Sequence, residues 1–143
     1  MKKAAGILSI FLLLFLAGCS TVKSPEESNT KEQAVNYQSL PKREKRDIYF
    51  KFHKSKSKSD YAVSMTVKNN SKKDVRFYLT KFMIMNSYDS DLEISSGLHK
   101  VIVVEPNSKV TVNNLFDHIS HMIFDDSSGY YYLDNNHLLA NVR

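Results

Sequence analysis

Three features of the chain predict an all-β fold. Apolar residues alternate with small or polar ones over residues 61–68, where Tyr61, Val63, Met65 and Val67 share one face of a strand. Polar turn signals recur about every eight to twelve residues. Beyond residue 47 no segment has a convincing helical period. Together these features predict an antiparallel β-sandwich over residues 48–143.

The first predicted strands lie on either side of a polar turn. Residues 48–52 carry Ile and Phe at alternate positions and predict one strand, and residues 61–68 predict the next. The sequence "NNSKKD" over residues 69–74 supplies Asn and Ser side chains that bond their own backbone in turns. A further strand over residues 75–85 completes a predicted hairpin, and its apolar run at residues 82–85 indicates burial on both faces.

The remaining strands occupy the C-terminal half. "LHKVIVVE" (98–105) and "KVTVNNLF" (109–116) predict two strands separated by Pro106, Asn107 and Ser108. "MIFDDSSGYYYL" (122–133) predicts another hairpin, with the turn from Asp125 to Gly129.

The N-terminus has the layout of a secretory signal. Lys2 and Lys3 precede an apolar run over residues 4–17, and the small residues Ala17 and Gly18 come just before Cys19. The apolar run is shorter than the about 20 residues that a membrane-spanning helix needs. We therefore expect a signal peptide over residues 1–18.

The end of this signal resembles the lipobox of bacterial lipoproteins, through Leu16, Ala17, Gly18 and Cys19. The resemblance implies that the Cys19 sulfur receives a diacylglycerol and that the chain is cut between Gly18 and Cys19. Two acyl chains anchor a protein stably, at about 0.8 kcal/mol per buried methylene. The predicted location is the extracytoplasmic face of the cell membrane, with no cofactor other than the covalent lipid on Cys19.

A tether is predicted between the anchor and the domain, over residues 19–47, because this segment has too few apolar residues to offset the entropy of ordering it. The positive charge of the chain, +5 in total, is concentrated where the tether meets the first strand, at Lys42, Arg43, Lys45, Arg46, Lys51, Lys54, Lys56 and Lys58. This cluster has two interpretations: attraction to anionic headgroups or an anionic wall polymer, or a solvated linker followed by a lysine-protected edge strand. Nucleic acid is not an expected partner, since the protein is expected to be exported.

Residues 67–77 and 104–112 resemble a family of small Ig-like domains of unknown function that recur in bacterial lipoproteins, through their strand and turn patterns. The resemblance implies an Ig-like antiparallel β-sandwich. The paired cysteines and core tryptophan of antibody-type domains are missing, since Cys19 is the only cysteine and the chain has no tryptophan.

Sequence motifs of catalysis are missing as well. The chain has no Gly-x-Ser-x-Gly elbow and no glycine-rich phosphate loop, and its single cysteine is assigned to lipid. We therefore expect a protein that is not an enzyme.

The segment "DHISHMIFDD" is the strongest candidate for a metal site. Asp117, His118, His121 and Asp125 are possible zinc ligands. Histidines three apart share a face only on a helix, whereas on a strand they point to opposite faces. The alternative is one exposed and one packed histidine, and turn chemistry for the acids.

The tyrosine run Tyr130, Tyr131 and Tyr132 is a candidate partner-binding surface. On a strand Tyr130 and Tyr132 share one face and Tyr131 takes the other, and the alternative is that the rings close the core. The sequence as a whole predicts a lipid-anchored binding module of the cell envelope whose ligand and protein partner it does not identify. Two alternatives stay open: a zinc-binding lipoprotein that uses the segment Asp117 to Asp126, and an inhibitor or accessory subunit of an exported enzyme.

Overall fold

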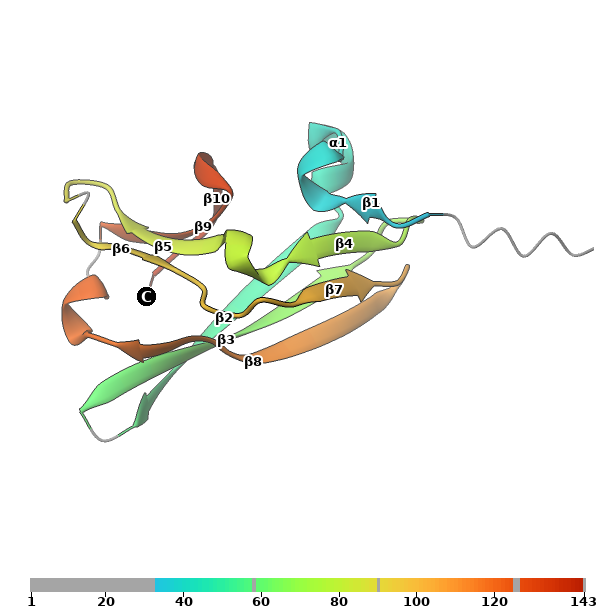
Figure 1. Ribbon diagram of the computed structural model, residues 1–143. Coiled ribbons are helices and arrows are strands. Elements are labelled where there is room, and N and C mark those ends of the chain that lie inside the picture. The colour runs from blue at the N-terminus through green and yellow to red at the C-terminus, as the bar shows by residue number, and fades with distance from the viewer. Residues whose placement is uncertain (1–32, 58, 90, 125–126, 143) are drawn as a thin grey trace, which may run out of the picture.

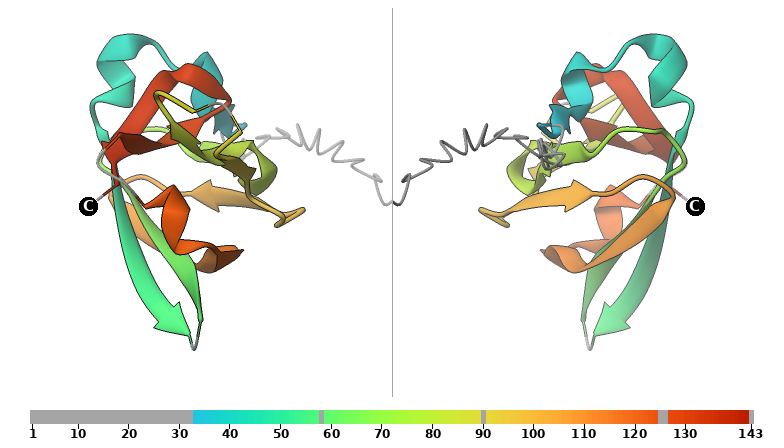
Figure 2. Two further views of the ribbon diagram at one scale, coloured as in Figure 1. Left: turned by 90° about the vertical axis from the view of Figure 1, so that its left-hand side faces the viewer. Right: turned by 90° about the vertical axis from the view of Figure 1, so that its right-hand side faces the viewer.

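The computed structural model describes residues 33–57, 59–89, 91–124 and 127–142. These residues form a mostly β structure with three sheets, ordered β2-β3-β8, β1-β4-β7 and β10-β9-β5-β6. The second and third sheets are consecutive, because β4 leads into β5, and both lie across the core from β2, β3 and β8 (Figures 1 and 2). The all-β prediction is confirmed at this level.

The first sheet contains β2 (Ile48–Ser57), β3 (Asp60–Asn69) and β8 (Ser108–Ile119), all antiparallel. The predicted alternation on β3 is confirmed, since Val63, Met65 and Val67 are fully buried. β2 is an edge strand, which agrees with the lysine-protected edge.

Strand β8 is irregular where it pairs with β3. The register shifts twice, and the non-glycine residues Asn114 and His118 in these stretches have φ of 49° and 54°. Such bulges turn extra residues toward one face. As a result Leu115, Phe116 and Ile119 all face the core, which a simple alternation would not allow.

Strand β4 (Val75–Tyr78) and strand β5 (Phe82–Asn86) belong to different sheets, separated by the 3-10 turn η2 (Leu79–Lys81). The predicted single strand over residues 75–85 is therefore wrong. The predicted hairpin across residues 69–74 is also wrong, since β4 pairs with β1 (Val35–Asn36) and β7 (Val101–Val104) rather than with β3.

The C-terminal strands complete the third sheet. Strand β9 (Ser128–Tyr132) lies between β5 and β10 (Asp134–Asn141), and β6 (Glu93–Ser95) pairs with the other side of β5. The predicted hairpin around Asp125 to Gly129 is wrong, because the 3-10 turn η3 (His121–Ile123) precedes this connection and β9 does not pair with it.

The predicted tether extends too far. Residues 35–47 pack onto the fold: Val35 aligns parallel with Val75, and α1 (Lys42–Lys45) follows the turn η1 (Tyr37–Ser39). Tyr37 and Leu40 are only 6% and 4% exposed. These few apolar side chains suffice to order the segment because they pack into the core formed by the rest of the domain. The polar composition of the segment as a whole gives no sign of this.

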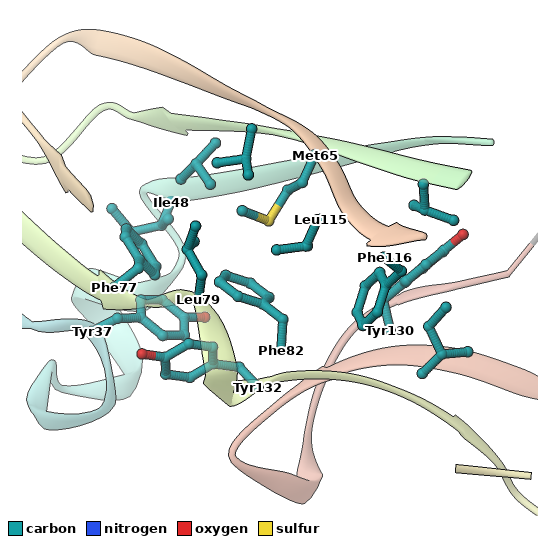
Figure 3. Packing of buried hydrophobic residues seen from close by; sticks show 14 of the residues in the cluster. Tyr37, Ile48, Met65, Phe77, Leu79, Phe82, Leu115, Phe116, Tyr130 and Tyr132 are labelled. Carbon is teal, nitrogen blue, oxygen red and sulfur yellow. The ribbon is translucent and has the colours of Figure 1, made fainter. Parts of the chain in front are cut away.

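Aromatic rings make direct contacts with one another in this core (Figure 3). The centre of the Tyr37 ring lies 5.1 Å from that of Phe77, in a stacked pair, and 5.3 Å from that of Tyr132, in a T-shaped pair. The centres of the Phe82 and Tyr132 rings are 4.8 Å apart. Each such pair contributes about 0.5 to 1.5 kcal/mol beyond its buried area. The N-terminal segment is thereby part of the central packing.

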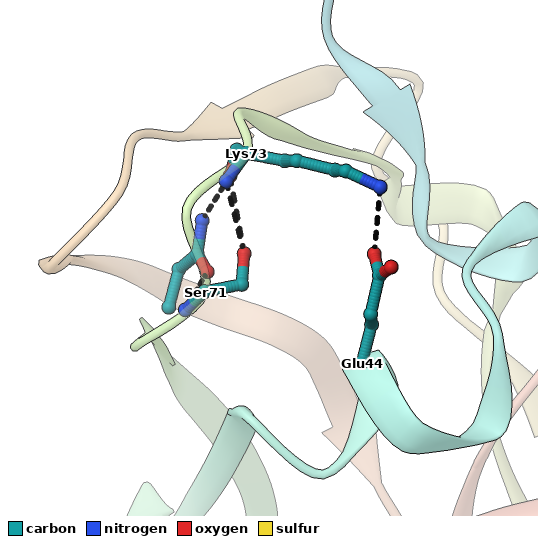
Figure 4. A network of polar contacts seen from close by, with 4 residues as sticks. Glu44, Ser71 and Lys73 are labelled. Carbon is teal, nitrogen blue, oxygen red and sulfur yellow. Dashed lines mark hydrogen bonds and ion pairs between the residues drawn. The ribbon is translucent and has the colours of Figure 1, made fainter.

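A polar network holds the turn after β3 (Figure 4). The buried Asn69 side chain donates to the carbonyls of Lys73 (2.7 Å) and Val104 (2.8 Å) and accepts from the Ser71 amide (2.9 Å). Lys73 also forms an ion pair with Glu44 of α1 at 2.9 Å. The turn thus joins β3, β7 and α1, and directs the chain from one sheet to the next.

Candidate functional site

The predicted lipidation and cleavage residues, Gly18 and Cys19, lie outside the described residues. No helix of the described part of the chain has both the length and the apolar character needed to cross a membrane. The anchor stays a prediction from the sequence.

The predicted metal ligands are dispersed. Asp117 and His118 lie near the end of strand β8. The Asp117 carboxylate accepts a hydrogen bond from the His118 amide, and His118 Nδ1 lies 3.4 Å from the Asp60 carboxylate. His121 instead begins η3 beside the Tyr61 ring. Asp125 lies outside the described residues. Among the residues that are described, no three His, Cys, Asp or Glu side chains form a group that could hold a metal ion.

Some residues of the basic cluster have structural contacts. Lys45 Nζ lies 5.3 Å from the centre of the Tyr37 ring, and Lys54 Nζ lies 4.7 Å from that of Phe124. Such cation–π contacts contribute about 0.5 to 1 kcal/mol at exposed sites. Lys58 lies outside the described residues.

The tyrosine run divides as its alternation predicts. Tyr130 and Tyr132 are 4% and 0% exposed and point into the core, whereas Tyr131 is half-buried on the outer face. Burial raises the pKa of Tyr130 to about 12 and also raises the pKa of Tyr132, so both stay neutral. Of the predicted partner-binding residues, Tyr131 is the most exposed; Tyr130 is buried but also borders a separate hollow beside Phe52 and Lys54.

Tyr131 lines two adjoining hollows of about 460 and 400 Å³, which share Ser87, Tyr88 and Tyr131. We call them together the Tyr88–Tyr131 groove. The larger also includes Met85, Asp89 and Glu93, and the smaller includes Asn141. Each hollow falls in the size range of ordinary ligand sites.

Gly129 fixes the position of the Tyr131 ring. A Cβ at Gly129 would lie 2.9 Å from Tyr131 Cε2 and 2.7 Å from Leu138 Cδ1. The ring therefore leans back along β9 over the glycine, and Tyr131 also lines the groove.

The loop that carries Tyr88 is held by Asn86. The Asn86 side-chain oxygen accepts from the amides of Tyr88 (2.8 Å) and Asp89 (3.0 Å), and its Nδ2 donates to Ser127 Oγ at 2.9 Å. The Ser87 amide donates to the Ser127 carbonyl at 3.0 Å. Tyr88 is 91% exposed although its backbone is fixed, so the loop presents an aromatic ring to solvent at little cost in ordering entropy.

The charge of the groove is opposite to that of the protein. The chain carries +5, yet the charged side chains among the described residues lining the groove are the acids Asp89 and Glu93. An electronegative hollow with aromatic walls suits a neutral or cationic ligand better than an anionic one.

Sequence reasoning missed Tyr88, Asp89 and Glu93. The signal that could have indicated them is "NSYDSD" over residues 86–91, where Asn and Asp with Ser predict a structured turn that exposes a tyrosine. Their convergence with Tyr131 depends on β5 pairing with both β6 and β9.

Comparison of the chain with protein-family models, curated proteins and solved structures found no match in any of the three.

Proposed function

We propose that the chain is a lipid-anchored binding module of the bacterial cell envelope, not an enzyme, with an Ig-like antiparallel β-sandwich that presents the Tyr88–Tyr131 groove on the extracytoplasmic side of the membrane. Support for the anchor comes from the signal layout and the lipobox-like residues that end at Cys19. Two acyl chains on that sulfur would retain the protein at the membrane.

The observation that carries the binding role is the presentation of Tyr88. A ring that is 91% exposed, on a loop fixed by Asn86 and beside the half-buried Tyr131, offers aromatic area with hydroxyl groups. Tyrosine is enriched in recognition surfaces because its ring packs and its hydroxyl bonds with little loss of side-chain entropy.

Detergent-phase partition of the protein from cells tests the anchor. The natural chain should enter the detergent phase and begin at an acylated Cys19 by mass spectrometry, whereas Cys19→Ala should keep its leader and carry no acyl mass. Ser20→Ala is the matched control and should behave like the natural chain. Equal acylation of the Cys19→Ala protein, or a mature chain that begins elsewhere, would refute the proposal.

A photo-crosslinking amino acid at position 88 tests the binding role in intact cells. We expect the crosslinking group at position 88 to give a recurring product with an envelope component. The same group at the exposed position of Tyr49 should not give this product. The same products at both positions would contradict a role for the groove.

A second candidate, an accessory or inhibitory subunit of an exported enzyme, is favoured by the edge strand β7. Its Val101 and Val103 are 52% and 41% exposed, an apolar stripe that a strand of a partner could cover. Val103→Lys should then abolish co-purification with the enzyme, and unchanged co-purification would exclude this surface.

A further inference from the structure

We propose that the Tyr88–Tyr131 groove binds a saccharide chain that carries free, protonated amino groups. The proposal rests on the proposed function and names the ligand class of the same site. It follows from the pairing of the central strands β5 and β9 and from the charge and the shape of the groove.

The two central strands beneath the groove, β5 and β9, offer no free edge, whereas Glu93 lies on β6 and Asn141 on β10, the two edge strands of this sheet. β5 is paired on one side with β9 and on the other with β6, and β9 is paired with both β5 and β10. An extended peptide usually binds by adding a strand to an open edge, with its backbone supplying much of the affinity. Over β5 and β9 recognition therefore depends on side chains, which suits a ligand whose own polar groups are hydroxyls and amines.

The charge of the groove selects for an amine. Glu93 aligns with Met85 across the β5–β6 ladder, and Asp89 lies in the adjoining loop, where its backbone is fixed by Asn86. A protonated amine is attracted both by these carboxylates and by the face of a tyrosine ring. An anionic wall polymer would be repelled by the same two acids.

The shape of the groove suits a linear oligomer. The two hollows meet at Ser87, Tyr88 and Tyr131, so a chain that fills one continues into the other past both rings. The Tyr131 ring, leaning over Gly129, provides a surface for the flat face of a sugar ring. The side chains of Ser87 and Asn141 provide polar groups for sugar hydroxyls.

Calorimetric titration of the mature protein in detergent micelles, with a glucosamine tetramer and an N-acetylglucosamine tetramer, tests this assignment. The first sugar has free amino groups that can be protonated, whereas in the second these groups are acetylated and carry no charge. The free-amine tetramer should bind about tenfold more tightly at low salt, and the difference should shrink as salt is added. Equal affinity for both sugars, or no binding of either, would overturn the proposal.

Variants identify the site. Tyr88→Ala should weaken the free-amine tetramer about five- to tenfold, and Glu93→Gln should reduce the preference for the free amine. Tyr49→Ala, which removes another exposed tyrosine on strand β2, should leave both affinities unchanged. An equal loss with Tyr49→Ala would remove the groove from the explanation. A protein that is acylated and crosslinks at position 88 but binds neither sugar retains the proposed function and loses only this ligand class.

Discussion

Replacing Asn69 by alanine should destabilise the fold more than any change at an exposed asparagine. The Asn69 side chain is fully buried and makes hydrogen bonds to the Lys73 and Val104 carbonyls and the Ser71 amide. Alanine leaves these three backbone groups without that partner, at about 1 kcal/mol each. We expect a loss of about 3 kcal/mol in the free energy of unfolding, measured by urea denaturation, and a fall in Tm of about 10 °C or more.

Asn69→Asp separates hydrogen bonding from side-chain volume. An ionised carboxylate would face the two carbonyls that Nδ2 now bonds, so burial and repulsion should raise its folded pKa above the unfolded value of about 3.9. The variant should therefore lose stability relative to the natural chain as the pH rises from the unfolded pKa through the folded pKa, and recover some of it toward acid. Asn113→Ala, on the exposed side of β8, is the control. A loss below about 1 kcal/mol for Asn69→Ala, or a pH-independent Asp variant, would refute this reasoning.

Three further predictions concern other parts of the fold. Burial, reinforced by neighbouring Tyr132, raises the pKa of Tyr37 to about 12; since an unfolded tyrosine ionises near pH 10, the contribution of Tyr37 to stability should be constant below about pH 10 and fall by about 2 to 3 kcal/mol toward pH 12. Urea titrations should show a smaller fall for Tyr37→Phe, and an equal fall would contradict the assignment. The partly exposed Glu44–Lys73 pair should give a coupling of about 0.5 to 1 kcal/mol in a double-mutant cycle, and zero coupling would show that α1 is held by packing alone. Gly129→Ala should displace the ring above it and weaken crosslinking at position 88, with a small change in Tm; unchanged crosslinking would mean that this ring does not shape the groove.

The sequence predicted those parts of the fold that depend on local alternation. Strand β3 follows it from Val63 to Val67, although Ala62 is buried as well, and Tyr130 and Tyr132 share one face as expected, which is the inner one. The pairing of the strands was harder to predict from the sequence. The turn at residues 69–74 is polar whether it closes a hairpin or crosses between sheets, and the decisive bond from Asn69 goes to Val104, which is distant in sequence.

The candidate site was predictable only in part, for a similar reason. The sequence named Tyr130, Tyr131 and Tyr132 together and placed Tyr131 on the opposite face from its two neighbours, but it did not show which face is outward. Tyr88 and Glu93 reach it only through the pairing of β5 with β6 and β9. The bulges at Asn114 and His118 also escaped the alternation argument, since a left-handed residue shifts the face of every side chain beyond it.

The entry of the chain beside β4 determines how the molecule would respond to pulling. A load applied through the N-terminal segment reaches the fold at the two-residue strand β1, and next at the buried ring of Tyr37. Detaching β1 breaks a short ladder, whereas extracting the ring removes it from contact with Phe77 and Tyr132. Release of residues 35–47 under tension would lengthen the N-terminal segment while β2, β3 and β8 stay paired. This segment would therefore yield before the sheet does.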